Sequence, residues 1–158
     1  MSDVTLPAVG IAFLLSQVGA HSAYTFEQKL AEIDLIPQHA GVLRMLGNNP
    51  GMTQKAMSDL FGIFPSRLVA LIDTLEGRGL LTRENNPDDR RSYNLHLTDL
   101  GKQCLQKIGA LTIELEQDML SALTQAELDT LSTYLRRIIA LQKVTPAVHP
   151  AYRNQNSK

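Results

Sequence analysis

The stretch from Thr53 to Gly101 constrains the fold of this chain more than any other part of it. It predicts a first helix from Thr53 to about Phe61, ended by Gly62, and a second helix that begins at Pro65. Glycine readily takes the positive φ found where a helix ends before a tight turn. Proline fits a first helical turn because its missing N–H is not needed there. Two short helices joined in this way form a helix-turn-helix.

Each of these two helices is predicted to bury one apolar face. In the first helix that face is formed by Ala56, Met57 and Leu60. The second helix places apolar residues at spacings of three and four, which indicates a buried stripe made of Leu68, Leu71, Ile72 and Leu75. Its opposite face is small or polar, so we expect that face to approach a partner outside the fold. The opposite face carries Ser66, Arg67, Val69, Ala70 and Asp73.

A β-hairpin is predicted after the second helix, with strands at residues 80–83 and 93–97. The loop between the strands concentrates charge in Asp88, Asp89, Arg90 and Arg91. Most such loops are only solvated, but a hairpin beside a helix-turn-helix can reach the neighbouring groove of DNA. The order of elements therefore predicts a winged helix-turn-helix, in a protein that is mainly α with a small β-hairpin wing.

Three spaced motifs resemble those of a known family. They are Leu75-Glu76-x-x-Gly79-Leu80-Leu81-x-Arg83, then Asn86-Pro87-x-Asp89-x-Arg91, then Leu97-Thr98-x-x-Gly101. In this order they resemble the MarR family of bacterial transcription regulators, many of which are repressors. The resemblance implies that the second helix enters the major groove of double-stranded DNA. It also implies that Arg91 enters the minor groove, that Asp89 orients Arg91, and that the protein is a homodimer on a palindromic operator.

The residues predicted to contact DNA lie at the start of the first helix, along the exposed face of the second helix and at the wing. They are Thr53, Gln54, Lys55, Pro65, Ser66, Arg67, Val69, Ala70, Asp73, Asp89, Arg90 and Arg91. The net charge of −1 is unlike that of a typical nucleic-acid-binding protein, and residues 67–102 hold six basic and six acidic side chains. We therefore expect DNA affinity to depend on two copies binding together. The alternative is a winged-helix module that docks a protein through the same surface.

The remainder of the 158 residues is predicted to form helices around this unit within a single domain. Apolar stripes indicate dimerisation helices over residues 7–34, interrupted at 19–22, and over residues 125–144. Residues 35–101 form the winged helix-turn-helix region, and residues 98–120 form a linking helix capped by Thr98. Residues 145–158 lack periodicity and are predicted to be disordered.

His21, Tyr24 and His39 are predicted to line an effector cavity where the first two helices meet the winged region. The alternative is that His21 and Tyr24 are ordinary half-buried residues. Members of the resembled family often respond to phenolic or aromatic acids. A small aromatic or phenolic effector is therefore the expected ligand.

No pattern of catalytic, cofactor-binding or metal-binding residues stands out. The four histidines are far apart in the sequence and none pairs with a cysteine or carboxylate at ligand spacing. The glycines follow no phosphate-binding pattern, so we expect neither an enzyme nor a cofactor or metal protein. The single Cys104 is expected to be a small buried hydrophobic residue. Neither a signal peptide nor a membrane-spanning stretch is visible, which favours the cytoplasm.

Overall fold

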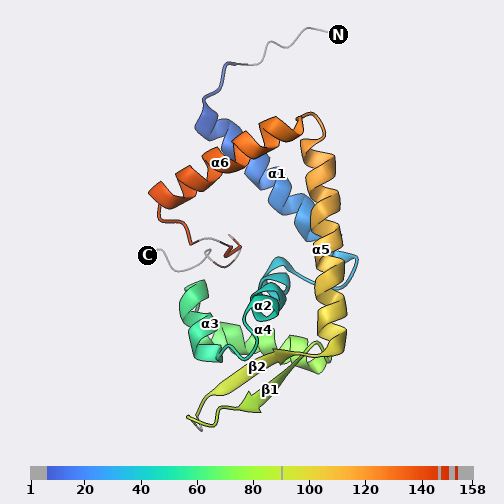
Figure 1. Cartoon of the computed structure of the whole chain (residues 1–158), viewed down its shortest axis with the longest axis vertical. Helices are drawn as coiled ribbons and strands as arrows, with labels where there is room; N and C mark the ends of the chain where they lie inside the picture. The colour runs from blue at the N-terminus through green and yellow to red at the C-terminus, as the bar shows by residue number, and fades with distance from the viewer. Residues whose placement is uncertain (1–6, 90, 146, 150–151, 153–158) are drawn as a thin grey trace.

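The computed structural model describes residues 7–89, 91–145, 147–149 and 152. Within them the chain forms α1 (Ile11–Ala31), α2 (Pro37–Asn48), α3 (Gln54–Phe61), α4 (Pro65–Gly77), β1 (Leu81–Asn85), β2 (Tyr93–Leu97), α5 (Asp99–Leu120) and α6 (Gln125–Leu141). Helices α2, α3 and α4 and the hairpin form a head at one end of the molecule, α1 and α6 cross at the other end, and α5 joins the two ends (Figure 1). The predicted fold, mainly α with a β-hairpin wing, is confirmed.

Side-chain caps and glycines set the ends of the helices in the head. The Thr53 hydroxyl oxygen accepts a hydrogen bond of 3.1 Å from the backbone N–H of Ala56, at the start of α3. Gly62 ends that helix with a φ of 63°. The Thr98 hydroxyl oxygen likewise accepts a 3.0 Å bond from the backbone N–H of Gly101 at the start of α5. The caps satisfy backbone groups that have no partner inside the helix, so these boundaries follow from local sequence.

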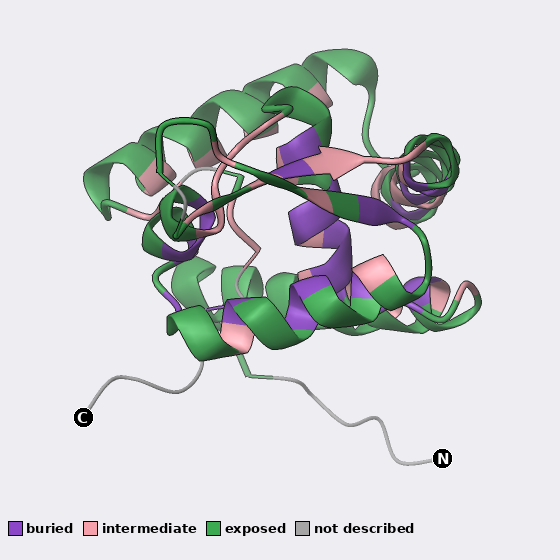
Figure 2. Ribbon diagram, turned by 90° about the horizontal axis from the view of Figure 1, so that it is seen from below, coloured by how far each residue is buried: buried purple, intermediate pink, exposed green. Residues whose placement is uncertain are grey.

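The core of the head forms where α2, α4 and the hairpin face one another and α5. Figure 2 shows the buried residues gathered in the middle of the molecule, with exposed faces around them. The predicted stripe of α4 is confirmed, because Leu68, Leu71, Ile72 and Leu75 are all buried.

The prediction for the buried face of α3 is wrong at two of its three residues. Ala56 and Leu60 are exposed, and the helix buries Met57, Ser58 and Phe61 instead. Ser58 tolerates burial because its hydroxyl donates a 2.8 Å hydrogen bond to the Ile63 carbonyl oxygen. Phe61 is covered by an aromatic ring from the far end of the chain, which the local pattern of α3 could not indicate.

The first turn of α5 lies directly against the backbone that precedes β1. A methyl group added at Gly101 would overlap the carbonyl oxygen of Leu80, so this contact requires glycine. The Thr98 hydroxyl also donates a 2.6 Å hydrogen bond to the carbonyl oxygen of Gly79, whose φ is 68°. The two glycines of the sequence motifs therefore fix how α5 leaves the wing.

The wing is an antiparallel pair of strands in which Leu81 faces Leu97 and Asn85 faces Tyr93. Leu95 is fully buried against the head, whereas Tyr93 is exposed, so the predicted buried face is limited to the base of the hairpin. Thr53 also forms a bridge with Asn94, which joins the start of α3 to β2. The wing and α3 therefore belong to one unit.

The terminal helices differ from the prediction in three respects. First, α1 is continuous through residues 19–22, because a glycine in a helix interior costs at most about 1 kcal/mol and the 21-residue helix tolerates it. Second, α6 ends at Leu141 rather than near residue 144, where Lys143 takes a left-handed φ of 52°. Third, Tyr152, which lies in the stretch predicted to be disordered, is buried, while residues 146, 150–151 and 153–158 lie outside the described residues.

None of the residues of α6 is buried within a single chain. The N-terminal half of α1 is similar, because Ile11, Leu15 and Val18 are exposed while Phe26 and Leu30 are buried. In the part of the chain that the structure describes, no helix is both long and apolar enough to cross a membrane.

Candidate nucleic-acid interface

The residues predicted to meet DNA come from three elements at the same end of the molecule, namely α3, α4 and the wing (Figure 1). On α4, Pro65, Ser66, Val69 and Ala70 are exposed and Arg67 is half-buried. The outward face of α4 is therefore uncovered over its first two turns. It presents small side chains and one arginine, which permits close approach by another molecule.

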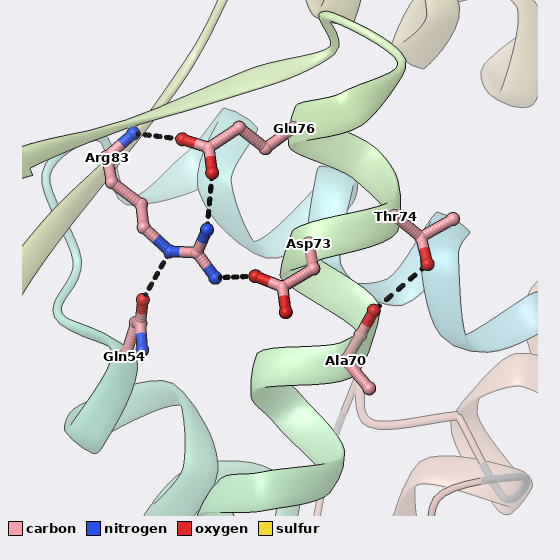
Figure 3. Close-up of polar contacts among 6 residues, drawn as sticks. All are labelled: Gln54, Ala70, Asp73, Thr74, Glu76 and Arg83. Atoms are coloured by element: carbon pink, nitrogen blue, oxygen red, sulfur yellow. Dashed lines mark hydrogen bonds and ion pairs between the residues drawn. The ribbon is translucent and has the colours of Figure 1, made fainter.

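Arg83 holds the two helices of the helix-turn-helix together (Figure 3). Its contacts with Gln54, Asp73 and Glu76 are called the clasp. It projects from β1, and its Nε donates a 2.8 Å hydrogen bond to the side-chain oxygen of Gln54 at the start of α3. Its two terminal nitrogens form ion pairs with Asp73 and Glu76 of α4. The backbone N–H of Arg83 also donates a 3.2 Å hydrogen bond to Glu76. Only 17% of the Arg83 side chain is exposed.

The contacts of Arg83 include two residues that are predicted to contact DNA, Gln54 and Asp73. Both side chains were expected to face DNA, but each is held by Arg83. Burial by itself would lower the pKa of Arg83, but hydrogen bonds and charge from Asp73 and Glu76 outweigh that and raise it. Arg83 therefore stays charged and compensates acidic groups on the recognition helix. Sequence analysis gave Arg83 no site role, although Glu76 and Arg83 both stand in the first spaced motif.

The positive charge that the surface offers comes from few residues. Lys55 is exposed but pairs with Asp59 at 2.7 Å, and its pKa is raised by that hydrogen bond. Among the described residues, Arg67 and Arg91 have no ion-pair partner in the structure. Arg90 lies outside the described residues. Part of the charge of this region is thus taken up in ion pairs, whereas Arg67 on α4 and Arg91 on the wing are left without one.

At the wing tip, Asp89 contacts the backbone of Arg91 rather than its guanidinium group. The Asp89 carboxylate accepts a 3.0 Å hydrogen bond from the backbone N–H of Arg91. Asn86 closes a similar turn by accepting a 2.9 Å bond from the N–H of Asp88. Asp89 and Arg91, both of which the structure describes, do not form the expected side-chain pair. A carboxylate two residues away along the chain reaches the backbone N–H more readily than the guanidinium group. Asp89 shapes the loop and leaves the Arg91 side chain exposed.

The predicted effector residues do not come together. His21 and Tyr24 are exposed on α1, whereas His39 is buried on α2. Burial lowers the pKa of His39, and the charge of Arg78 lowers it further. This buried imidazole belongs to the head, apart from the two exposed side chains of α1.

A cavity of about 190 Å³ lies instead between α1, α2 and the segment after α6. Its lining includes Phe26, Pro37, Gly41, Arg44, Val148 and His149. The Arg44 guanidinium lies 5.7 Å from the centre of the Phe26 ring, so the cavity has a cationic and an aromatic wall. Sequence analysis missed it because one wall belongs to a segment that was expected to be disordered.

A recognition helix with an uncovered face, beside an exposed hairpin tip that carries an arginine, defines the winged helix-turn-helix class of DNA-binding proteins. The chain belongs to the MarR family: the family model matches residues 33–92, which run from the end of the α1 region to the wing.

The relatives agree with this assignment. A protein assigned as the transcriptional regulator for the hcr operon of Thauera aromatica is 36% identical over 107 residues, or 68% of this chain, and the match spans 64% of that regulator's length. The transcriptional repressor CouR, solved with a 23-mer DNA duplex, superposes with a TM-score of 0.72 at 32% identity, covering 82% of this chain and 92% of CouR. A cysteine-to-serine variant of MarR from E. coli, solved with operator DNA, shares the fold, with a TM-score of 0.70 at 22% identity, over 82% and 93% of the two chains.

Replacing Arg83 with methionine tests the clasp. The Arg83→Met side chain keeps an apolar stem but leaves Asp73 and Glu76 without their shared partner. We expect the free energy of unfolding in urea to fall by about 1.5–2 kcal/mol. This is the lower part of the range for charged hydrogen bonds, because both carboxylates still meet solvent. The matched control Arg91→Met removes an exposed arginine and should change stability by less than about 0.5 kcal/mol. Equal losses in both variants would show that Arg83 is not a clasp.

Proposed function

We propose that the protein is a sequence-specific, DNA-binding transcription regulator that acts as a homodimeric repressor on a palindromic double-stranded operator. The observation that carries the proposal is the pairing of an uncovered α4 face bearing Arg67 with a wing tip bearing Arg91, at one end of a MarR-family chain. CouR and the E. coli MarR variant, which share this fold, were solved with DNA.

In this proposal α4 reads bases and the wing reads the shape of the groove. Ser66, Arg67 and Val69 lie near the start of α4, where a recognition helix contacts base edges in the major groove. Arg91 enters the adjacent minor groove, where a narrow groove rich in A·T pairs attracts arginine. Asp89 supports Arg91 indirectly, through the turn that it forms with the Arg91 backbone.

Three single variants separate these roles. Arg67→Ala should change the preferred sequence, at a cost of about 1–3 kcal/mol at the base that Arg67 reads. Arg91→Ala should weaken binding to operator and unrelated DNA alike and flatten the dependence of affinity on salt. Asp89→Ala should weaken binding mildly, although it removes a negative charge, because the turn that presents Arg91 is lost.

The measurement is a salt titration of affinity, using an operator obtained by selecting bound sequences from a random DNA pool. Tighter binding by Asp89→Ala would contradict the assigned role of the wing. A wild-type affinity that hardly changes with added salt would favour protein docking over DNA binding, because phosphate contacts release counterions.

The terminal helices support the dimer. Among the described residues, Ile11, Leu15 and Val18 of α1 are exposed in the single chain, and no residue of α6 is fully buried. Between α5 and α6 runs an open groove of about 540 Å³. It is lined mainly by aliphatic side chains, among them Leu120, Leu128, Leu131, Leu135 and Ile139. A second copy that covers α1 and α6 would remove these surfaces from water.

Charge placed in this seam tests the dimer. The double variant Leu135→Asp/Ile138→Asp should produce a monomer at micromolar concentration in light scattering, because burying unpaired carboxylates costs several kcal/mol. The control is Thr133→Asp, on the opposite side of α6, which should remain dimeric. A monomeric wild-type protein would contradict the proposal.

We further propose that the cavity between α1, α2 and the segment after α6 binds the effector. Its volume of about 190 Å³ is below the roughly 300–1,000 Å³ of pockets for drug-sized ligands, so it suits a molecule with one ring. Arg44 offers a charged partner for a carboxylate, and Phe26 offers an aromatic surface. These features favour a small aromatic or phenolic acid.

Operator release by a panel of single-ring carboxylates, such as benzoate and hydroxybenzoates, tests this site. Arg44→Met should raise the concentration needed for release by at least about tenfold, the loss that follows from one charged hydrogen bond. His21→Ala, which changes an exposed residue outside the cavity, should leave the response intact. If no acid acts on the wild-type protein, or if Arg44→Met responds normally, the cavity is not the effector site.

A further inference from the structure

Tyr152 joins two helices of the head from the far end of the sequence. Its ring is 2% exposed and stacks on Phe61 of α3, with ring centres 4.2 Å apart and an interplanar angle of 22°. Its hydroxyl donates a hydrogen bond to the carbonyl oxygen of Gln38 in α2. The ring also fills the space beside Gly41, where an added methyl group would overlap it. This close fit makes Tyr152 an anchor and not a passing surface contact.

The anchored segment begins at the end of α6, a helix that belongs to the opposite end of the molecule (Figure 1). Between α6 and Tyr152, Val148 packs against the core and the His149 ring lies 5.8 Å from the ring of Phe26. In the view of Figure 1, the described part of this segment lies on one side of α2 and α5 lies on the other. The head is therefore connected to the terminal helices from two sides.

The other connections are a continuous helix and a short turn. Helix α5 runs unbroken for 22 residues from the wing to the terminal helices. The turn between α1 and α2 is held by Arg78, which donates hydrogen bonds to the backbone carbonyls of Ile33 and Asp34. Neither of these connections includes a residue of α3. If Tyr152 were released, α3 and α2 would lose their contacts with the segment that follows α6.

We infer that Tyr152 is a positioning residue that fixes the separation of the two recognition helices in the dimer, and so restricts the protein to one half-site spacing. The inference rests on the proposed function as a DNA-binding dimer. Each segment after α6 links a head to its own terminal helices, which form the proposed seam. Two heads that are fixed to one seam are fixed relative to each other.

Half-site spacing is a sensitive measure of that restriction. One base pair inserted between half-sites moves them apart by about 3.4 Å and rotates them by roughly 35°, since a helical turn holds about 10–10.5 base pairs. A fixed pair of heads cannot follow this change and loses contacts in one half-site. A pair of released heads can follow it, at the cost of weaker binding to the optimal spacing.

The experiment compares affinities for the selected operator and for versions with one or two base pairs inserted or deleted at its centre. We expect the wild-type protein to lose at least about tenfold in affinity for a change of one base pair, and Tyr152→Ala to lose less than about threefold. Tyr152→Phe retains the stacked ring and should keep the steep wild-type profile. A change in overall stability alone would lower affinity for all spacings equally and leave the profile steep.

A second variant disrupts the contact between Tyr152 and α2 by changing a residue of α2. Gly41→Ala places a methyl group where the Tyr152 ring lies, yet alanine favours a helix more than glycine does. It should therefore flatten the profile without loss of helix α2, and it decides the matter if Tyr152→Ala does not fold. Gly109→Ala is the control, because a methyl group there meets nothing within 4 Å in α5.

A steep profile in Tyr152→Ala or in Gly41→Ala overturns the inference, as does equal flattening in Gly109→Ala. A wild-type protein that binds every spacing equally overturns the inference but leaves DNA binding intact. Failure of the wild-type protein to bind any selected DNA overturns the proposed function as well, and this result precedes any comparison of variants.

Discussion

The position of the recognition helix depends on the interaction of Arg83 with Gln54, Asp73 and Glu76. One guanidinium group holds α3, α4 and the first strand of the wing together, and its planar shape fixes their relative orientation. The same interaction neutralises part of the acidic charge of α4. A chain with a net charge of −1 can then present Arg67 and Arg91 to a partner, because Asp73 and Glu76 of α4 are paired with Arg83. The contacts of Arg83 therefore determine both the orientation of α4 and the charge on its surface.

Local sequence predicted the features of the head that local physics determines. The buried stripe of α4, the caps at Thr53 and Thr98 and the turn at Gly62 all depend on neighbours within a few residues, and all are confirmed. The motif glycines were also informative, since Gly101 approaches the Leu80 carbonyl too closely for any side chain. The residues that meet DNA stay predictions, but α3, α4 and the wing bring them to one end of the molecule.

Features that depend on distant contacts could not be predicted in the same way. The buried face of α3 was wrong because Phe61 packs on Tyr152, and Tyr152 bonds to Gln38 across 114 positions of sequence. The cavity between α1, α2 and the segment after α6 was missed for the same reason, since its second wall follows α6. At the wing, the proximity of Asp89 and Arg91 was evident, but sequence alone did not distinguish a backbone partner from a side-chain partner.

The exposed state of α6 in a single chain has a consequence for the amount of protein in the cell. Helix α6 has 17 residues and a capping box but no buried side chain, whereas most helical stability in proteins comes from packing of an apolar face. In the proposed homodimer, chain concentration would control helical order as well as dimer formation. The segment that carries Tyr152 begins at the end of α6. In a dilute, newly made chain the head would therefore be folded while α6 and this segment were still incompletely ordered. The abundance of the chain would then determine when it becomes able to bind DNA as the proposed dimer, independently of the proposed effector.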